Sequence, residues 1–273
     1  MGTAAKLQSK GTGKGKRPAR LGLWKCNEKS CRKQFTVKVG TVFEHGRIPL
    51  HKMLQAVYLL CCSKKGISSH QLHRILQIQY KSAWFLSHRI REAMRDGSLA
   101  PMGGGGKIVE VDETFYGKLE GAPKHIKAGL RSSWRNTILA LVERGGSART
   151  FHINGTTMGT LLPIIRVNIN RETAIMTDEC KAYRPLGKEF ASHEAVTTWP
   201  RNTCGNVSTN TVEGYFSLFK RGMKGVYQHC SEKHLHRYLA EFDFRYSHRV
   251  RLGYSDTERT AMALKGVVGK RLT

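Results

Sequence analysis

The chain of 273 residues is long enough for one large domain, or for a small domain beside a core of ordinary size, and its 40% of hydrophobic residues exclude a largely disordered protein. Lys and Arg number 46 against 20 Asp and Glu, a formal net charge of +26 that favours a polyanionic partner, most simply nucleic acid. Ribosomal proteins and membrane-surface proteins share this balance, so the charge alone identifies no function.

The N-terminal segment, residues 1–20, is rich in Gly, Lys and Ser and is predicted to be a flexible basic arm. No apolar stretch follows it, so a secretory signal is not expected. The most apolar window of the chain, residues 53–62, is too short to span a bilayer. The cysteines, 7 in number and widely scattered, favour a reducing cytoplasm over a disulfide framework.

Residues 21–48 hold short apolar and aromatic pieces around Cys26 and Cys31. The spacing of the two cysteines is that of one knuckle of a zinc ribbon, but a tetrahedral structural zinc needs four ligands and no cysteine precedes Cys26. His45 or His51 is an alternative ligand, although nothing in the spacing requires either. We interpret this segment as a partial, degenerate zinc ribbon and keep a Zn²⁺ ion on Cys26 and Cys31 only as an alternative.

Between residues 49 and 96 apolar side chains recur at helical spacing, which predicts a helix-turn-helix region. The break "GISS" at residues 66–69 offers Ser68 or Ser69 as the N-cap of a helix. The next helix, at about residues 81–95, has an apolar stripe made of Ala83, Leu86, Ile90 and Met94. We expect a second set of its side chains to project toward nucleic acid: Lys81, Ser82, Trp84, His88, Arg89 and Arg91.

Residues 97–106, "GSLAPMGGGG", form the clearest linker in the chain, and the types of element change after it. Strands are predicted at residues 107–117, 136–146, 148–154, 173–178 and 194–199, and helices at about residues 156–170, at 180–187 and from Thr209 onward. The resulting order β-β-β-α-β-α-β-α fits an α/β domain with a mixed sheet, in which a three-strand meander precedes strands joined through helices.

Three acids stand at the ends of these predicted elements: Asp112 on the first strand, Asp178 after the fourth and Glu213 in the first turn of the last helix. Each alone has a structural explanation, as a solvated strand end or as an acid favoured by a helix N-terminus. Together they are more telling, because functional groups of α/β sheets gather where strands end. On the first strand, Glu110 shares the face of Asp112 while Glu113 points to the opposite face.

This order of elements and acids resembles the RNase H-like, retroviral-integrase-like core of DDE transposases. More narrowly, the segments "VEVDETFYGK", "MTDECKAYRPLG" and "NTVEGYFSLFKRGMKGVYQH" resemble the transposases of bacterial zinc-ribbon insertion sequences, ISXO-like, and their relatives of the Merlin group. The resemblance runs from about residue 23 to residue 249. It implies a catalytic domain at residues 107–251, followed by a C-terminal tail at residues 252–273.

The resemblance implies that Asp112, Asp178 and Glu213 form a DDE triad that binds two Mg²⁺ or Mn²⁺ ions. Carboxylate oxygens suit Mg²⁺, and two such ions can activate the attacking oxygen and stabilise the leaving one in a phosphodiester displacement. Water, and then the freed 3′-hydroxyl, would be the nucleophiles. Glu113 is expected to be structural or to support the metal ligands, and a supporting role stays open for Glu110.

Further positions on the last helix follow from the same resemblance. One face of that helix carries Asn210, Glu213, Ser217, Lys220 and Lys224. Related transposases have a Lys seven positions after the last acid, which implies that Lys220 contacts the scissile phosphate; a solvated Lys is the alternative. Asn210 would orient substrate or water, and Lys224 would bind DNA. For His193 a core, a DNA-contacting and a catalytic role all stay open, because its neighbours depart from the family pattern.

As a whole, the sequence predicts a transposase that binds the terminal inverted repeats of an insertion sequence and cuts and joins double-stranded DNA. We expect a homo-oligomer on DNA, in the cytoplasm and associated with the nucleoid. Relatives complete the zinc ribbon with an upstream Cys-x2-Cys pair, so either the reading frame starts late or the ribbon has decayed. Two alternatives remain: an inactive transposase-derived DNA-binding protein, and an RNase H-like nuclease without strand transfer.

Overall fold

The structure, a computed structural model, describes residues 5–7, 22–95, 97, 100–122, 134–196 and 207–272. The basic arm predicted at residues 1–20 lies outside the described residues, except for the three that form strand β1 (Ala5–Leu7). Within the described ranges, no helix is both long enough and apolar enough to cross a membrane.

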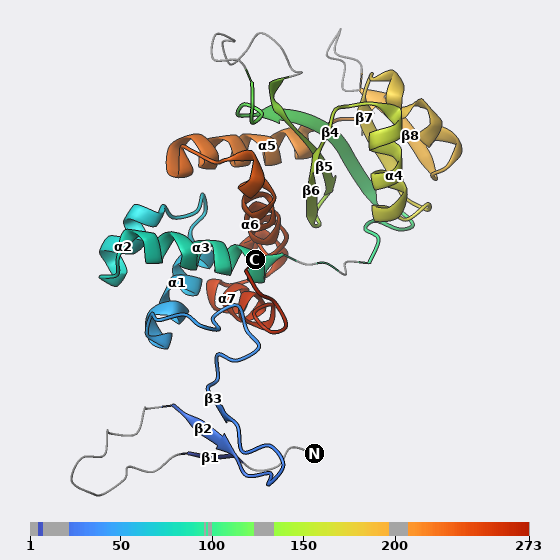
Figure 1. The fold of residues 1–273 in the computed structure, drawn as a ribbon. Helices are drawn as coiled ribbons and strands as arrows, with labels where there is room; N and C mark the ends of the chain where they lie inside the picture. The colour runs from blue at the N-terminus through green and yellow to red at the C-terminus, as the bar shows by residue number, and fades with distance from the viewer. Residues whose placement is uncertain are drawn as a thin grey trace, which may run out of the picture.

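A five-stranded mixed sheet forms the centre of the larger part of the molecule (Figure 1). The strand order is β6-β5-β4-β7-β8, with β4 (Ile108–Tyr116), β5 (Asn136–Glu143), β6 (Ala148–Ile153), β7 (Ala174–Asp178) and β8 (Ser192–Val196). The first three strands pair as an antiparallel meander, and β7 and β8 follow in parallel to β4. The predicted α/β class, with a mixed sheet in which a three-strand meander precedes strands joined through helices, is therefore confirmed, although the last strand begins two residues earlier than expected.

Helices cover both faces of this sheet, because strands buried on both sides need apolar partners on each. Val109 and Val111 of β4 pack on one face beneath α4 (Met158–Asn168) and η2 (Lys181–Lys188). The opposite face lies beneath α5 (Asn210–Gly222) and α6 (Leu235–Ser247). The apolar stripe of α5 is fully buried against it: Val212, Phe216, Phe219 and Met223. Three short helical segments flank α6 in the chain: η3 (Met223–Tyr227) and η4 (Glu232–His234) before it, and η5 (Val250–Leu252) after it.

A second core lies in the helical region, which contains α1 (Leu50–Cys62), α2 (Ser69–Leu76) and α3 (Tyr80–Met94). As expected, Ser68 caps α2 by accepting the backbone N–H of Gln71 at 3.1 Å. The predicted apolar stripe of α3 is buried in this core.

The residues after 251, expected to be a C-terminal tail, contain a further helix, α7 (Asp256–Lys265). Ala263 of α7 and the following Val267 are buried in the same core as α1 and α3. A capping box between Ser255 and Glu258 begins this helix. The sequence "SDTE" carries that signal, so the helix was open to prediction.

The N-terminal segment forms a small three-stranded sheet of β1, β2 (Trp24–Cys26) and β3 (Gln34–Phe35), which Figure 1 shows at the far end of the molecule from the central sheet. Cys26 ends β2 and Cys31 follows in the turn before β3. The Cys31 thiol accepts hydrogen bonds from the backbone of Lys33 and from Cys26, which hold its pKa below the usual value. The two thiols are therefore adjacent.

The helical region meets the part that contains the five-stranded sheet through a buried ionic cluster between α3 and α6. Arg91 of α3 is 1% exposed and donates through Nε to Glu241 Oε2 at 2.6 Å. Glu241, 0% exposed, also accepts from the guanidinium of Arg245 and from the Tyr227 hydroxyl. The expectation that Arg91 projects toward DNA is therefore wrong, because α6 covers it.

Two other α3 side chains expected at the nucleic-acid surface are also engaged inside the protein. Arg89 donates to the carbonyls of Val42 and Glu44 at 2.8 and 2.7 Å, and so holds the segment before α1. His88 is 1% exposed, and its ring lies among the rings of Trp84, His234 and Tyr238. Lys81 is exposed at the start of the helix.

The ionic cluster gives a stability prediction. Glu241→Gln removes the carboxylate that neutralises two buried guanidinium groups, so we expect it to lower the free energy of unfolding by about 3–5 kcal/mol. Chemical denaturation followed by circular dichroism measures this change. The control is Glu189→Gln, which breaks an exposed pair with Arg166 and should cost far less, because water screens the pair. Equal losses in the two variants would contradict a special role for the cluster.

Candidate active site

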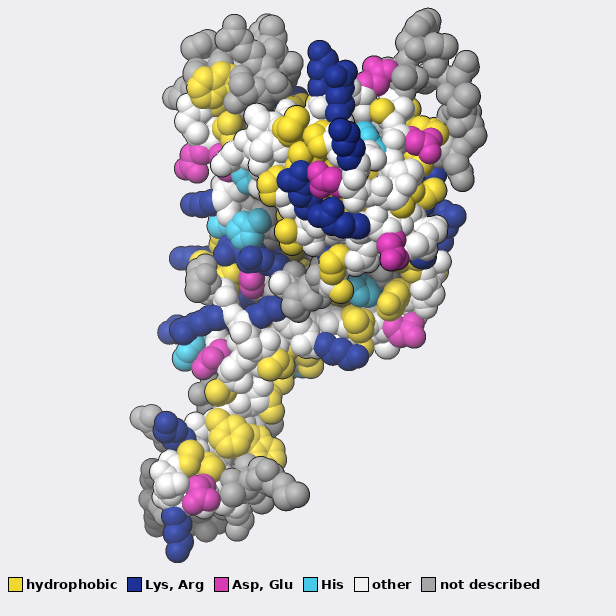
Figure 2. Space-filling view, turned by 90° about the vertical axis from the view of Figure 1, so that its right-hand side faces the viewer, with side chains coloured by type: hydrophobic (Ala, Val, Ile, Leu, Met, Phe, Trp, Pro, Cys, Tyr) yellow, Lys and Arg dark blue, Asp and Glu magenta, His cyan; other side chains and the backbone are white. Residues whose placement is uncertain are grey.

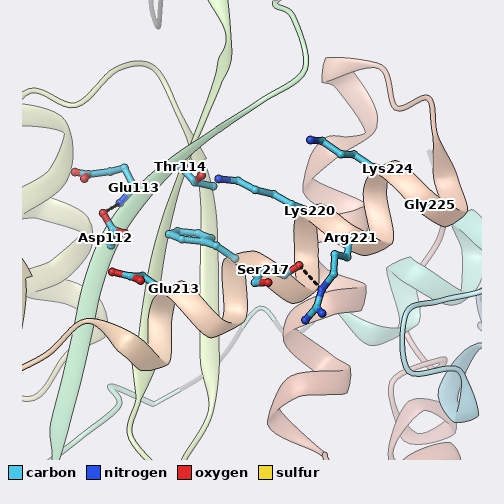
Figure 3. A pocket seen from close by; sticks show the side chains of 10 residues that line it. Asp112, Glu113, Thr114, Glu213, Ser217, Lys220, Arg221, Lys224 and Gly225 are labelled. Atoms are coloured by element: carbon cyan, nitrogen blue, oxygen red, sulfur yellow. Dashed lines mark hydrogen bonds between the residues drawn. The ribbon is translucent and has the colours of Figure 1, made fainter. Parts of the chain in front are cut away.

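An open pocket of about 810 Å³ lies beside β4, between the sheet and α5 (Figure 3). Its acidic end carries Asp112, Glu113 and Glu213, and its basic end carries Lys220, Arg221 and Lys224. Figure 3 shows the side chains of Glu213, Lys220 and Lys224 extending from the helix toward β4. Acids and cations from distant parts of the chain thus share one opening.

The parallel pairing of β4 with β7 brings Asp112 close to Asp178. The register pairs Ile108 with Ala174, an offset of 174 − 108 = 66 residues. Continuing that offset by a few residues sets Asp112 beside Asp178, since 178 − 112 = 66. Carboxylate oxygens of Asp112, Glu113 and Asp178 lie within 4.8 Å of one another, the spacing that a metal ion needs.

The Asp112 carboxyl is half-buried and accepts the backbone N–H of Glu113 at 2.7 Å. Burial raises the pKa of Asp112 to about 6, and the like charges of Asp178 and Glu213 add to the rise. Asp178 is exposed at the end of β7, and its oxygen accepts the backbone N–H of Cys180 at 3.1 Å.

Glu113 is closer to the other acids than the sequence suggested. It was expected to point away from Asp112 on the opposite face of the strand, and its carboxylate does accept the hydroxyl of Tyr183 from η2 on that side. β4 stays paired with β5 here, with Asp112 opposite Ala140 and Glu113 opposite Leu139, but its ladder with β7 ends at Glu110. The edge of β4 that faces Asp178 is therefore open, and the carboxylates of Asp112 and Glu113 both come close to that of Asp178. Burial raises the pKa of Glu113 to about 7. Alternation along a strand alone could not reveal this proximity.

Glu213 lines the same pocket from the first turn of α5 but stands outside the group of three close oxygens. The Thr209 hydroxyl donates to Glu213 Oε1 at 3.0 Å and orients the carboxylate. Among the ion pairs of the described residues, none includes Asp112, Glu113, Asp178 or Glu213. Four carboxylates without a paired cation fit a site for a divalent metal ion.

Lys220 is half-buried in the pocket, two helical turns after Glu213. Burial lowers the pKa of Lys220, and the neighbouring Arg135 adds to the lowering while Asp112 opposes it. Lys224 also lines the pocket, at its basic end, and is exposed. Asn210 is exposed at the start of α5 and does not line the pocket.

Glu110 does not reach the pocket, although it shares the strand face of Asp112. It is 0% exposed, and its carboxylate accepts the backbone N–H groups of Thr211 and Val212 at 2.7 and 2.9 Å. Arg144 donates to its other oxygen at 2.6 Å. The sequence left Glu110 open as an indirect ligand of the metal, but it lies outside the pocket and instead caps α5.

His193 lies on β8 and is paired with Ile175 of β7. Its Nε2 is 2.9 Å from the Thr177 hydroxyl, which itself donates to the Asp178 carbonyl. Burial lowers the pKa of His193. The structure thus gives this histidine a contact one residue before Asp178, within the sheet.

The acidic pocket gives a prediction about the metal-free protein. The folded pKa of Asp112, about 6, lies above its ordinary value of 3.8, so stability is lost as the pH rises from about 4 past 6. Asp112→Asn carries no charge and should raise the unfolding free energy by about 2 kcal/mol at pH 8, with a gain that shrinks toward pH 4. Denaturation in EDTA at both pH values measures this.

Glu194→Gln is the matched control, because Glu194 is an exposed acid of the same sheet, on the edge strand β8. We expect it to change the unfolding free energy by less than about 0.5 kcal/mol. An Asp112→Asn protein no more stable than the wild type at pH 8 would show that burial and the neighbouring acids do not destabilise the charged Asp112 carboxylate.

The cysteine pair gives a second prediction. Among the described residues, the only group of three or more metal-binding side chains is the acidic one, so Cys26 and Cys31 lack two of the four ligands of a structural zinc. We expect purified protein to contain well under one zinc per chain by elemental analysis. Stoichiometric zinc, lost in a Cys26→Ser variant, would contradict this interpretation.

Comparison with known proteins identifies the family. Residues 103–247, more than half of the chain, match the ISXO2-like transposase domain. An "Uncharacterized protein in transposable element ISH50" of Halobacterium salinarum is 27% identical over 232 residues, which cover 80% of this chain and 76% of the relative. The crystal structure of the Mos1 strand transfer complex covers 84% of this chain and 82% of its own at 11% identity, with a TM-score of 0.31 that supports no conclusion. The family match includes Asp112, Asp178 and Glu213, and the chain belongs to the ISXO2-like transposase family.

Proposed function

We propose that this protein cuts DNA at the ends of an insertion sequence and joins the freed 3′ ends to target DNA. The observation that supports this most strongly is the acidic pocket: Asp112 lies close to Asp178 of β7 and shares a pocket with Glu213 of α5, in a chain of net charge +26. Within the part of the chain that the structure describes, none of these acids has an ion-pair partner. An acidic centre in so basic a protein fits a metal site to which a polyanion is brought.

The proposed metal ligands are Asp112, Asp178 and Glu213, and the divalent ions are Mg²⁺ or Mn²⁺, bound as a pair. Glu113 joins them as a further candidate, because its oxygen lies in the same close group as those of Asp112 and Asp178. When bound, the ions supply Lewis-acid stabilisation of the charge that develops on the attacking and leaving oxygens of a phosphodiester.

The basic end of the pocket is suited to the phosphates of the substrate. Seven residues separate Lys220 from Glu213, which is about 10 Å along a helix, and four more residues lead to Lys224, about 6 Å further. In this proposal Lys220 contacts the phosphate being cut and Lys224 a neighbouring phosphate. Asn210, at the exposed start of α5, would orient substrate from outside the pocket.

The proposed DNA partner is double-stranded, as terminal inverted repeats and as target. Figure 2 shows Lys and Arg side chains on many parts of one face, and such charge speeds the approach of a polyanion. In the helical region, exposed Lys81 remains a proposed contact, whereas Arg89 and Arg91 are engaged within the protein. By analogy with the family, we extend the proposal to a homo-oligomer that holds two DNA ends together.

Cleavage and strand transfer of labelled terminal DNA in Mg²⁺ or Mn²⁺ test the proposal. Asp112→Ala and Glu213→Ala should each lower the cleavage rate at least about a thousandfold, or ~4 kcal/mol of transition-state stabilisation. Binding of the same DNA should stay within about threefold, because neither acid attracts phosphate. Equal loss of binding and cleavage would instead indicate that the acids serve folding.

The same assay separates the two other functions. Cleavage by the wild type without joined products would indicate a nuclease without strand transfer. Specific binding with no cleavage in either metal would indicate a DNA-binding protein derived from a transposase. Joined products would support the proposed reaction against both.

A further inference from the structure

We propose that Glu110 and Arg144 are positioning residues that fix the distance between Glu213 on α5 and Asp112 on β4. This inference rests on the proposed function, because it concerns how the same acidic site is assembled. Neither residue reaches the pocket. Both act through the backbone of α5.

The first turn of α5 lacks a cap from its own sequence. Its N-cap residue, Thr209, makes no side-chain hydrogen bond to the first N–H groups of the helix. The Thr209 hydroxyl donates instead to the carboxylate of Glu213, at 3.0 Å. The free N–H groups at the start of a helix must be satisfied when they are buried, so the cap has to come from elsewhere.

Glu110 supplies that cap from the strand below. One of its oxygens accepts the N–H groups of both Thr211 and Val212, at 2.7 and 2.9 Å. A full negative charge at a helix N-terminus also interacts favourably with the helix dipole. The start of α5 is thus bonded directly to β4, two residues before Asp112.

Arg144, in the turn after β5, adds further bonds to the same region. We call Glu110 and Arg144 together the clamp. Its Nε donates to Glu110 at 2.6 Å, and its terminal nitrogen donates to the carbonyl and the hydroxyl of Ser208 at 2.8 and 2.9 Å. Its backbone N–H donates to the carbonyl of Ile108, at the start of β4. One side chain therefore joins the strand, the turn and the residue that precedes the helix N-cap.

The clamp acts over a short distance. Glu110 and Asp112 share one face of β4 and lie about 7 Å apart along the strand. On the helix, Glu213 follows the two capped residues within the same turn. A small shift of the capped turn therefore moves the Glu213 carboxylate by a similar amount relative to Asp112.

Metal binding provides the test, because it depends on where Glu213 lies. The probe is Mn²⁺ alone, with free ion measured by electron paramagnetic resonance at a temperature where circular dichroism shows the protein folded. Glu110→Gln keeps the shape of the side chain but removes its charge and turns an amide toward Arg144. We expect its Mn²⁺ affinity to fall about tenfold, as for other residues that support metal ligands. Arg144→Lys, a milder change, should give a smaller loss.

Glu241→Gln is the matched control, because Glu241 is also a fully buried carboxylate with an Arg nitrogen at 2.6 Å, but lies outside the pocket. Its Mn²⁺ affinity should stay within about twofold of the wild type. A second check uses Glu213→Gln as the background. If Glu110 acts through Glu213, adding Glu110→Gln there should cause no further loss of affinity.

Each outcome bears on the inference. A Glu110→Gln protein that is folded and binds Mn²⁺ as well as the Glu241→Gln control would overturn it while leaving the proposed function intact. Additive losses in the Glu213→Gln background would overturn it too, since Glu110 would then act by another route. A wild type that neither binds Mn²⁺ nor cleaves DNA would reject the proposed function, and the inference with it.

Discussion

The parallel register between β4 and β7 is the constraint on which the site depends. That register brings Asp112 and Asp178 together at the point where the β4–β7 ladder ends, so two acids 66 residues apart (178 − 112) face each other without a peptide partner between them. Sheets of this class place functional groups at such edges, because the backbone no longer fills the space. Helix α5 brings a further acid, Glu213, to the pocket beside this edge.

The charges of the carboxylates at this edge determine its effect on stability and its attraction for cations. Asp112, Glu113 and Glu213 line one pocket, and burial, with the like charges of Asp178 and Glu213, raises the pKa of Asp112 to about 6. Holding a partly buried negative charge near like charges destabilises the metal-free fold near neutral pH and favours a divalent cation that enters. By contrast, the acids that stabilise the fold are fully neutralised: Glu110 by Arg144 and a helix N-terminus, and Glu241 by two arginines. The same residue type thus has opposite roles, according to whether a partner is present.

Features of the fold that depend on a short stretch of chain could be predicted from the sequence. The order of elements, the buried stripes of α3 and α5 and the Ser68 cap all follow from spacing along a short stretch of chain. Burial of Arg91 could not be predicted in this way, because its partner Glu241 is 150 residues away on a helix whose docking is a tertiary event. The closeness of Glu113 to Asp178 depends on where a strand ladder stops, and the capping role of Glu110 on which helix starts above it. Helix α7 was missed although "SDTE" signalled its start.

The central claim is that Asp112, Asp178 and Glu213 hold the divalent ions at which DNA is cut. The most direct measurement is the anomalous scattering of Mn²⁺ in crystals of the protein bound to terminal DNA. We expect Mn²⁺ density in contact with carboxylate oxygens of Asp112 and Asp178, with Glu213 completing the site and the cut phosphate beside Lys220. Mn²⁺ density elsewhere on the protein, or an ordered complex with no metal between β4, β7 and α5, would contradict it.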